Sequence, residues 1–130
     1  MKKTSTIAVT IIIIGILVAI FIIIKKTSVI EKKLSLENLT SFAQCLSSKN
    51  ITMYGAEWCS HCKREKALFG SAFKYVPYVE CPQNEKLCLD RGINGYPTWI
   101  DGNDTKYIGE QGLDGLSKIS GCILPVSVSK

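Results

Sequence analysis

The sequence predicts an α/β domain, with a central mixed sheet flanked by helices, that follows one N-terminal transmembrane helix. Three observations indicate this: a long apolar segment near the start, an alternation of strand-like and helix-like segments after it, and two closely spaced cysteines at the first strand-to-helix junction. With 130 residues, the chain has room for one small domain. We expect a flank at residues 1–6, an anchor at 7–24, a charged tether at 25–35, the domain at 36–124 and a tail at 125–130.

The apolar segment is long enough to cross a bilayer. As a helix, its eighteen residues extend about 27 Å, close to the roughly 30 Å of a hydrocarbon core. A cleaved signal peptide is the alternative. Such apolar regions are usually shorter, however, and Lys25 and Lys26 follow this one with no clear cleavage site of small residues. We therefore expect a retained, single-pass membrane anchor.

Charge does not decide which side of the membrane the domain occupies, because lysines flank the apolar segment at both ends. Six cysteines in a small domain favour an oxidising compartment, so we expect the domain on the extracytoplasmic side. From residue 36 onward, ten basic residues balance ten acidic ones. This balance provides no basic face for nucleic acid, and we expect the flanking lysines to contact lipid headgroups.

The domain begins with a helix, since Leu36, Leu39, Phe42 and Leu46 recur at helical spacing after Ser35, a candidate N-cap. Pro77 places the second expected strand at a sheet edge, or else marks where the chain turns into that strand. The further elements expected, in order, are a strand at residues 51–54, a helix at 59–69, a strand at 76–80, a short helix at 84–91, a hairpin of 98–100 with 105–108, and a closing helix marked by Leu113, Leu116 and Ile119.

The paired cysteines, Cys59 and Cys62, have the spacing of a redox dithiol. At the end of a strand and the start of a helix, free backbone N–H groups and the helix dipole stabilise a thiolate at Cys59. Cys62 lies one turn further along the helix. We expect Cys59 to be exposed and to attack, and Cys62 to resolve the mixed disulfide. His61 places a possible positive charge beside the Cys59 thiolate, although a merely solvated side chain is the alternative.

A zinc site or a fixed structural disulfide are the other interpretations of this cysteine pair. A tetrahedral zinc site needs four Cys or His ligands, and Cys81 and Cys88 could supply two of them. Their spacing of seven residues is unusual for a zinc knuckle, and His61 is the only histidine in the chain. We expect neither a bound metal nor an organic cofactor.

Three separate blocks of sequence resemble a known family. They are Met-Tyr-Gly-Ala-Glu-Trp-Cys-Ser-His-Cys at residues 53–62, Val-Pro-Tyr-Val-Glu-Cys at 76–81 and Gly-Tyr-Pro-Thr-Trp at 95–99. Together they resemble the thioredoxin-like fold, and most closely the thioredoxin-like domain fused to vitamin K epoxide reductase homologues, over about residues 36–122. In that family the domain exchanges disulfides with secreted proteins and is reoxidised by the quinone-linked membrane part. Because one span replaces that multi-helix body here, the resemblance implies a separate membrane oxidase as partner.

The resemblance also implies roles for residues around the dithiol. It makes Pro97 a cis-proline beside the cysteines, with Tyr96 offering backbone groups to a substrate strand. We expect Trp58 and Trp99 to pack and to shield the site rather than to recognise a specific substrate, with Trp58 among the residues where substrate binds. Met53 stands where thioredoxins commonly bury an aspartate, so water or another group must activate Cys62. Family members that donate disulfides often carry His at the position of His61.

Four further cysteines allow three pairings. We expect structural disulfides between Cys81 and Cys88 and between Cys45 and Cys122. The alternative is that Cys81 and Cys88 form a second redox pair that relays electrons to the first.

Together, these features predict a membrane-anchored thiol-disulfide oxidoreductase. We expect it to donate disulfides to reduced cysteines of exported proteins and to be reoxidised by a membrane oxidase of the vitamin K epoxide reductase type. A disulfide reductase of the same architecture is one alternative. A non-enzymatic anchored module, in which all disulfides are structural, is the other.

Overall fold

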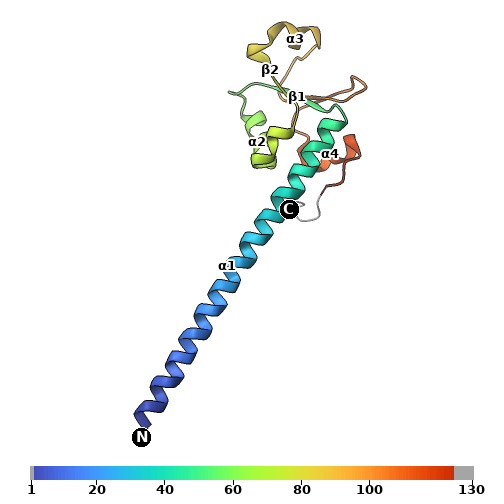
Figure 1. The fold of residues 1–130 in the computed structure, drawn as a ribbon. Coiled ribbons are helices and arrows are strands. Elements are labelled where there is room, and N and C mark those ends of the chain that lie inside the picture. The colour runs from blue at the N-terminus through green and yellow to red at the C-terminus, as the bar shows by residue number, and fades with distance from the viewer. Residues whose placement is uncertain (1, 125–130) are drawn as a thin grey trace. The chain divides into compact units, whose positions relative to one another are not determined.

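The computed structural model describes residues 2–124, and the expected C-terminal tail at 125–130 lies outside them. The chain divides into two compact units between residues 34 and 35. The first unit is entirely helical in its described part (Figure 1). The second unit carries the sheet and all six cysteines.

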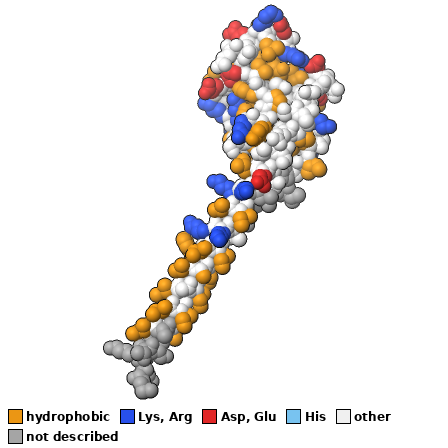
Figure 2. Space-filling model, in the orientation of Figure 1, with side chains coloured by type: hydrophobic (Ala, Val, Ile, Leu, Met, Phe, Trp, Pro, Cys, Tyr) orange, Lys and Arg blue, Asp and Glu red, His pale blue; other side chains and the backbone are white. Residues whose placement is uncertain are grey.

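Helix α1 spans Lys2–Ser48 and contains the expected anchor. From Val9 onward it reaches a mean hydropathy of 2.7, and none of this apolar stretch is buried within the protein. Figure 2 shows hydrophobic side chains along the helix, followed by a group of basic ones. Among the described residues, this one helix is long and apolar enough to cross a membrane, and a signal sequence satisfies the same test.

Residues 25–35, the expected charged tether, are helical. Ser35 lies inside α1, so the expected N-cap and new helix start at this residue are wrong. No Gly or Pro occurs between Gly15 and Gly55, and nothing in this stretch therefore stops an α-helix. The hydroxyl of Thr27 donates to the carbonyl of Ile23, four residues earlier, at 2.9 Å. Such local bonds let polar side chains remain on a helix without interrupting it.

A four-stranded mixed sheet forms the second unit, in the order β2-β1-β3-β4. Its strands are β1 (Thr52–Gly55), β2 (Tyr78–Glu80), β3 (Thr98–Ile100) and β4 (Lys106–Ile108). β1 pairs in parallel with β2 and antiparallel with β3, which forms the expected hairpin with β4. β2 is an edge strand and begins just after Pro77, as the proline predicts.

Helices cover both faces of this sheet. Besides the end of α1 they are α2 (Ser60–Phe69), α3 (Glu85–Asp90) and α4 (Gly112–Ser120), with short 3-10 helices η1 (Gly70–Tyr75) and η2 (Cys81–Gln83). In Figure 1, α2 and α4 lie on one side of the strands and α3 on the other. The order of helices and strands is the expected one, apart from the 3-10 helices.

Neighbouring residues of β1 show how the strand serves two cores. Met53 is fully buried among side chains of α1, α2 and α4, including Phe42, Phe69 and Leu116. Tyr54, the next residue, packs on the opposite side with Cys81 and Cys88. Successive side chains of a strand point to opposite faces, so β1 contributes side chains to the core on each face of the sheet.

Two disulfides join the expected pairs. Cys45 near the end of α1 is bonded to Cys122 after α4, across 77 positions of sequence. Cys81 of η2 is bonded to Cys88 of α3, seven positions apart. Among the described residues, Cys59 and Cys62 are the free cysteines.

Candidate redox site

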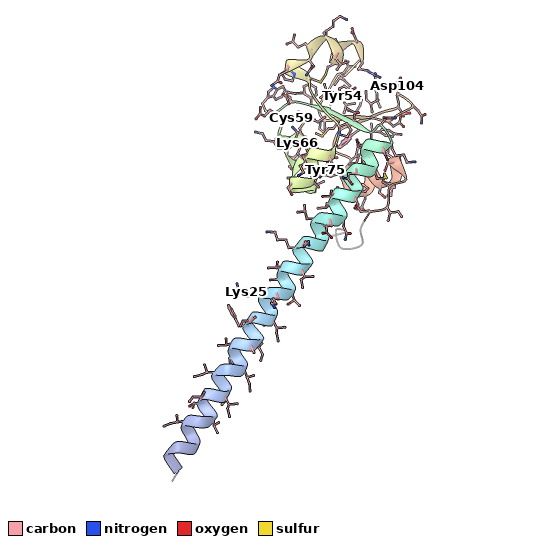
Figure 3. The ribbon with its side chains drawn as sticks, in the orientation of Figure 1. Lys25, Tyr54, Cys59, Lys66, Tyr75 and Asp104 are labelled. Carbon is pink, nitrogen blue, oxygen red and sulfur yellow. A yellow bond between two sulfur atoms is a disulfide. The ribbon has the colours of Figure 1, made fainter. Side chains whose placement is uncertain are left out.

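Cys59 is the N-cap of α2, directly after the loop that leaves β1 (Figure 3). Its Sγ accepts a hydrogen bond from the backbone N–H of Cys62 at 3.2 Å, and its thiol donates to the carbonyl of Tyr96 at 3.7 Å. A sulfur that takes the place of a capping oxygen faces the unpaired N–H groups of the first helical turn. The sulfur of Cys59 thus lies at the start of the helix, where the sequence places it.

Cys59 is less exposed than expected, with only 6% of its surface accessible. It borders an open hollow of about 540 Å³, whose lining residues are Trp58, Cys59, Ser60, His61, Ile93, Asn94, Gly95 and Tyr96. The sulfur is therefore reached from one side, through a surface that mixes aromatic rings with polar groups.

Cys62 is completely buried, one helical turn beyond Cys59. Burial is the main cause that raises the pKa of its thiol to about 12, and its interaction with Cys59 adds to the effect. The ammonium group of Lys66 acts in the opposite direction. In the reduced protein Cys62 is thus held as a neutral thiol at physiological pH.

Alkylation should distinguish the two thiols. We expect iodoacetamide to modify Cys59 alone in the reduced, folded chain at pH 7 to 9, because the Cys62 thiol loses its proton only near the pKa of about 12. Mass spectrometry of the digested protein measures this, with the denatured chain as the control in which both react. Labelling of Cys62 at the rate of Cys59 below pH 9 would contradict the assignment of roles.

His61 is not simply solvated. Its Nδ1 lies 2.5 Å from Oε1 of Glu110, and Nη2 of Arg64 lies 2.6 Å from the same nitrogen. Nη2 of Arg64 also donates to Oε1 of Glu110 at 2.5 Å. The hydrogen bond from Arg64 is the main cause that holds the pKa of Glu110 below its usual value, and the one with His61 adds to the effect. The imidazole is therefore held beside the dithiol by an acid and a guanidinium that the sequence pattern did not indicate.

A buried carboxylate brings Glu110 to the start of α2. Glu65 is only 1% exposed, and its Oε1 accepts hydrogen bonds from the backbone N–H groups of Gln111 and Gly112, both at 3.0 Å. Burial raises the pKa of Glu65, and these hydrogen bonds offset part of the effect. Because Gln111 and Gly112 begin α4, Glu65 links α2 to α4 and fixes the residue just before them.

Tyr96 and Pro97 lie where the resemblance puts them. Their peptide bond is cis, and the carbonyl of Tyr96 accepts the hydrogen bond from Cys59. The ring of Trp58 meets that of Tyr96 edge to face, with centroids 5.9 Å apart, while 71% of Trp58 is exposed. Trp99, in contrast, is fully buried. An aromatic pair, exposed at Trp58 and half-buried at Tyr96, thus lies beside the sulfur.

The Cys81–Cys88 disulfide lies under the neighbouring surface. Both cysteines are buried, and they border a second hollow of about 390 Å³ that also reaches Trp58 and Tyr96. With their sulfurs bonded to each other, these cysteines are not available as thiolate ligands for zinc. The disulfide therefore forms part of the lining of this second hollow, together with Trp58 and Tyr96.

Comparison with known proteins finds redox relatives, although no family model matches the chain. The chain is 42% identical to the thiol-disulfide oxidoreductase LTO1 of Arabidopsis thaliana over 90 residues, which are 62% of this chain and 24% of that protein. It is 42% identical over 55 residues to a protein disulfide-isomerase of Aspergillus oryzae, covering 37% of this chain and 11% of the relative. These relatives support the thioredoxin superfamily.

A third relative extends the comparison to animals. The thioredoxin domain-containing protein 5 homolog of Drosophila melanogaster is 34% identical over 89 residues, which are 58% of this chain and 21% of that protein. The chain thus spans a quarter or less of the length of these relatives. Its mixed sheet flanked by helices fits a thioredoxin-like fold, and the names of the relatives support an oxidoreductase activity.

Proposed function

We propose that this chain is a membrane-anchored thiol-disulfide oxidoreductase that donates disulfides to reduced cysteines of exported proteins. The observation that carries the proposal is the position of Cys59: its sulfur caps α2, borders an open hollow and lies beside the carbonyl of Tyr96. Cys62, fully buried, is accessible to Cys59 but not to solvent. Such an arrangement supports attack at one sulfur and departure of the other.

Donation proceeds in two exchanges. A substrate thiolate attacks Sγ of Cys59 in the oxidised pair, the bond between Cys59 and Cys62 breaks, and the electron pair remains on Cys62, which takes up a proton. A second substrate thiolate then attacks the substrate sulfur of the mixed disulfide and releases Cys59 as a thiolate. The substrate loses two electrons and two protons, and the enzyme disulfide becomes a Cys62 thiol and a Cys59 thiolate, with the second proton released to water.

Reoxidation requires an electron acceptor outside the domain. We propose a membrane disulfide oxidase of the vitamin K epoxide reductase type, on the basis of the resemblance of residues 53–62, 76–81 and 95–99 to domains fused to such enzymes. The apolar part of α1 supports a location in the same bilayer, and the cysteine content supports an extracytoplasmic domain.

Transfer to a reduced protein tests this function. We expect the oxidised full chain, in detergent micelles, to form disulfides in a reduced and unfolded protein while its own Cys59–Cys62 pair becomes reduced. The midpoint potential of that pair, measured in glutathione buffers, should be well above the thioredoxin value of about −270 mV. A potential near that value, with net reduction of substrate disulfides, would instead indicate a reductase. Failure to exchange in either direction would favour the non-enzymatic module.

Variants of His61 and Glu110 test whether the charged groups near the dithiol influence its midpoint potential. His61→Pro should make the Cys59–Cys62 disulfide harder to reduce, because it removes an imidazole beside Cys59 that can carry a positive charge. Glu110→Gln should make it easier to reduce, because it removes the negative charge that His61 and Arg64 share. A tenfold change in equilibrium corresponds to about 30 mV. Equal potentials for both variants and the natural chain would remove the role given to His61.

A further inference from the structure

Cys62 must exchange a proton each time the pair opens or closes, yet it is buried. Its thiol is neutral in the reduced protein, and the attack of Cys62 on a mixed disulfide at Cys59 requires that this proton leave. Met53 provides no acid or base at the position where thioredoxins bury an aspartate. The group that takes the proton must therefore lie elsewhere around Cys62.

Gly55 shows which side chain lies close to the buried sulfur. A Cβ added at this residue, the last of β1, would lie 2.9 Å from Sγ of Cys62 and 3.4 Å from Oη of Tyr78. Because Gly55 has no side chain, no Cβ stands between the thiol on α2 and the phenol on β2. Both atoms lie within 3.4 Å of the position that this Cβ would take, so one bridging water can join the sulfur and the hydroxyl.

The hydroxyl of Tyr78 is already connected to a carboxylate. It donates a short hydrogen bond to Oε2 of Glu80, while Oε1 of Glu80 accepts the backbone N–H of Glu57 at 2.8 Å. Both Tyr78 and Glu80 are half-buried, so the chain of groups leads from the buried thiol toward the surface. A phenol in this position can accept a proton on its oxygen while it passes its own proton on.

Lys66 supplies the positive charge along this route. Its Nζ lies 3.5 Å from the centroid of the Tyr78 ring, and its ammonium favours the thiolate of Cys62. The ionisable groups that act on the thiol and the phenol are thus Cys59 at the N-cap of α2, Lys66 in its last turn and Glu80 of β2. The cation offsets negative charge that develops on sulfur or phenol oxygen during transfer.

We propose that Tyr78 and Glu80 form the proton path of Cys62. As Sγ of Cys62 attacks Sγ of Cys59 in a mixed disulfide, the thiol proton moves to Oη of Tyr78 and the Tyr78 proton moves to Oε2 of Glu80. The bond from Cys59 to the bound thiol breaks, and that thiol leaves as a thiolate. Glu80 then releases its proton to water. During donation the same path runs in reverse. This inference rests on the proposed function, because it concerns the same dithiol.

Reaction of the reduced full chain with excess Ellman's disulfide, in detergent micelles, separates the two steps. The first release of thionitrobenzoate reports attack by Cys59, and the second reports attack by Cys62. Tyr78→Phe removes only the hydroxyl and keeps the ring that contacts Lys66. We expect it to slow the second release about 100-fold at neutral pH and to leave the first unchanged. The deficit should shrink as pH rises, because hydroxide then takes the Cys62 proton.

Two further variants complete the experiment. Glu80→Gln keeps the oxygen that accepts the N–H of Glu57 but cannot take up a proton in the same way, and it should slow the second release at least about tenfold. Tyr75→Phe, at an exposed tyrosine of η1, is the matched control and should change neither release.

Three results would overturn the proposal. They are a second release at the natural rate in Tyr78→Phe, a deficit that is the same at every pH, and an equal slowing of both releases, which would indicate a disturbed site. If the natural chain itself shows no second release, the proposed function fails first, and the proton path fails with it.

Discussion

A chain with Cys59→Ser is expected to lose disulfide exchange entirely, while Cys62→Ser is expected to stop after its first step. Serine at position 59 leaves no sulfur at the start of α2 for a substrate thiolate to attack, and the buried Cys62 has no access to substrate. Without Cys62 no internal thiol can release a substrate bound to Cys59. We expect a fall of at least about a thousandfold in turnover for Cys59→Ser, from the loss of the reactive sulfur.

Trapping measures the difference between these variants. When Cys62→Ser is incubated with oxidised glutathione, we expect a stable glutathione adduct to accumulate at Cys59. The adduct is visible as a mass increase that a reductant reverses. Cys59→Ser should form none. Because both replacements remove one sulfur and leave the structural disulfides in place, each controls for the other. An adduct of equal yield at Cys62 in the Cys59→Ser variant would show that the burial of Cys62 does not restrict access.

Removal of the Cys45–Cys122 disulfide should be the most destabilising change outside the site. The bond ties α1 to the segment after α4, and it closes a loop across 77 positions. In the chain-entropy description such a crosslink contributes about 4.5 kcal/mol to the free energy of unfolding. For a domain of this size we expect Cys45→Ala with Cys122→Ala to lower the melting temperature by about 20 °C or more.

The second disulfide provides the comparison. Cys81 and Cys88 are seven positions apart, so their removal should cost only about 2.5 kcal/mol. Thermal unfolding of the full chain in detergent, followed by circular dichroism, measures both double variants. A larger loss for the Cys81 and Cys88 pair than for the long-range pair would mean that local packing around α3, rather than loop length, determines what each bond contributes.

Local sequence predicts the dithiol well because the relevant forces are local. The strand before Cys59, the helix after it and the capping geometry all depend on residues within a few positions of one another. The closing helix, expected from Leu113, Leu116 and Ile119, is confirmed as α4 for the same reason. Periodicity and caps act over one or two turns, and that is the range over which a sequence is easily interpreted.

Contacts between distant segments account for what the sequence did not indicate. Glu110 is 49 positions from His61 and reaches it only because Glu65 fixes the start of α4. Tyr78 comes close to Cys62 through the parallel pairing of β1 with β2, which no spacing pattern reveals. The helical state of residues 25–35 was missed for a different reason: charged residues suggested a tether, but lysine and glutamate are also good helix formers.

The attachment of Glu110 through Glu65 to the start of α4 has a consequence for biosynthesis. During translation both site cysteines emerge about fifty residues before the ribosome has supplied this segment. Until then the nascent chain carries two thiols without the acid that neighbours His61 and without the helix N-terminus that Glu65 binds. The dithiol therefore acquires its final redox potential late, when the last third of the polypeptide has folded onto the rest. Before that point the dithiol of the unfinished chain reacts differently from that of the mature protein.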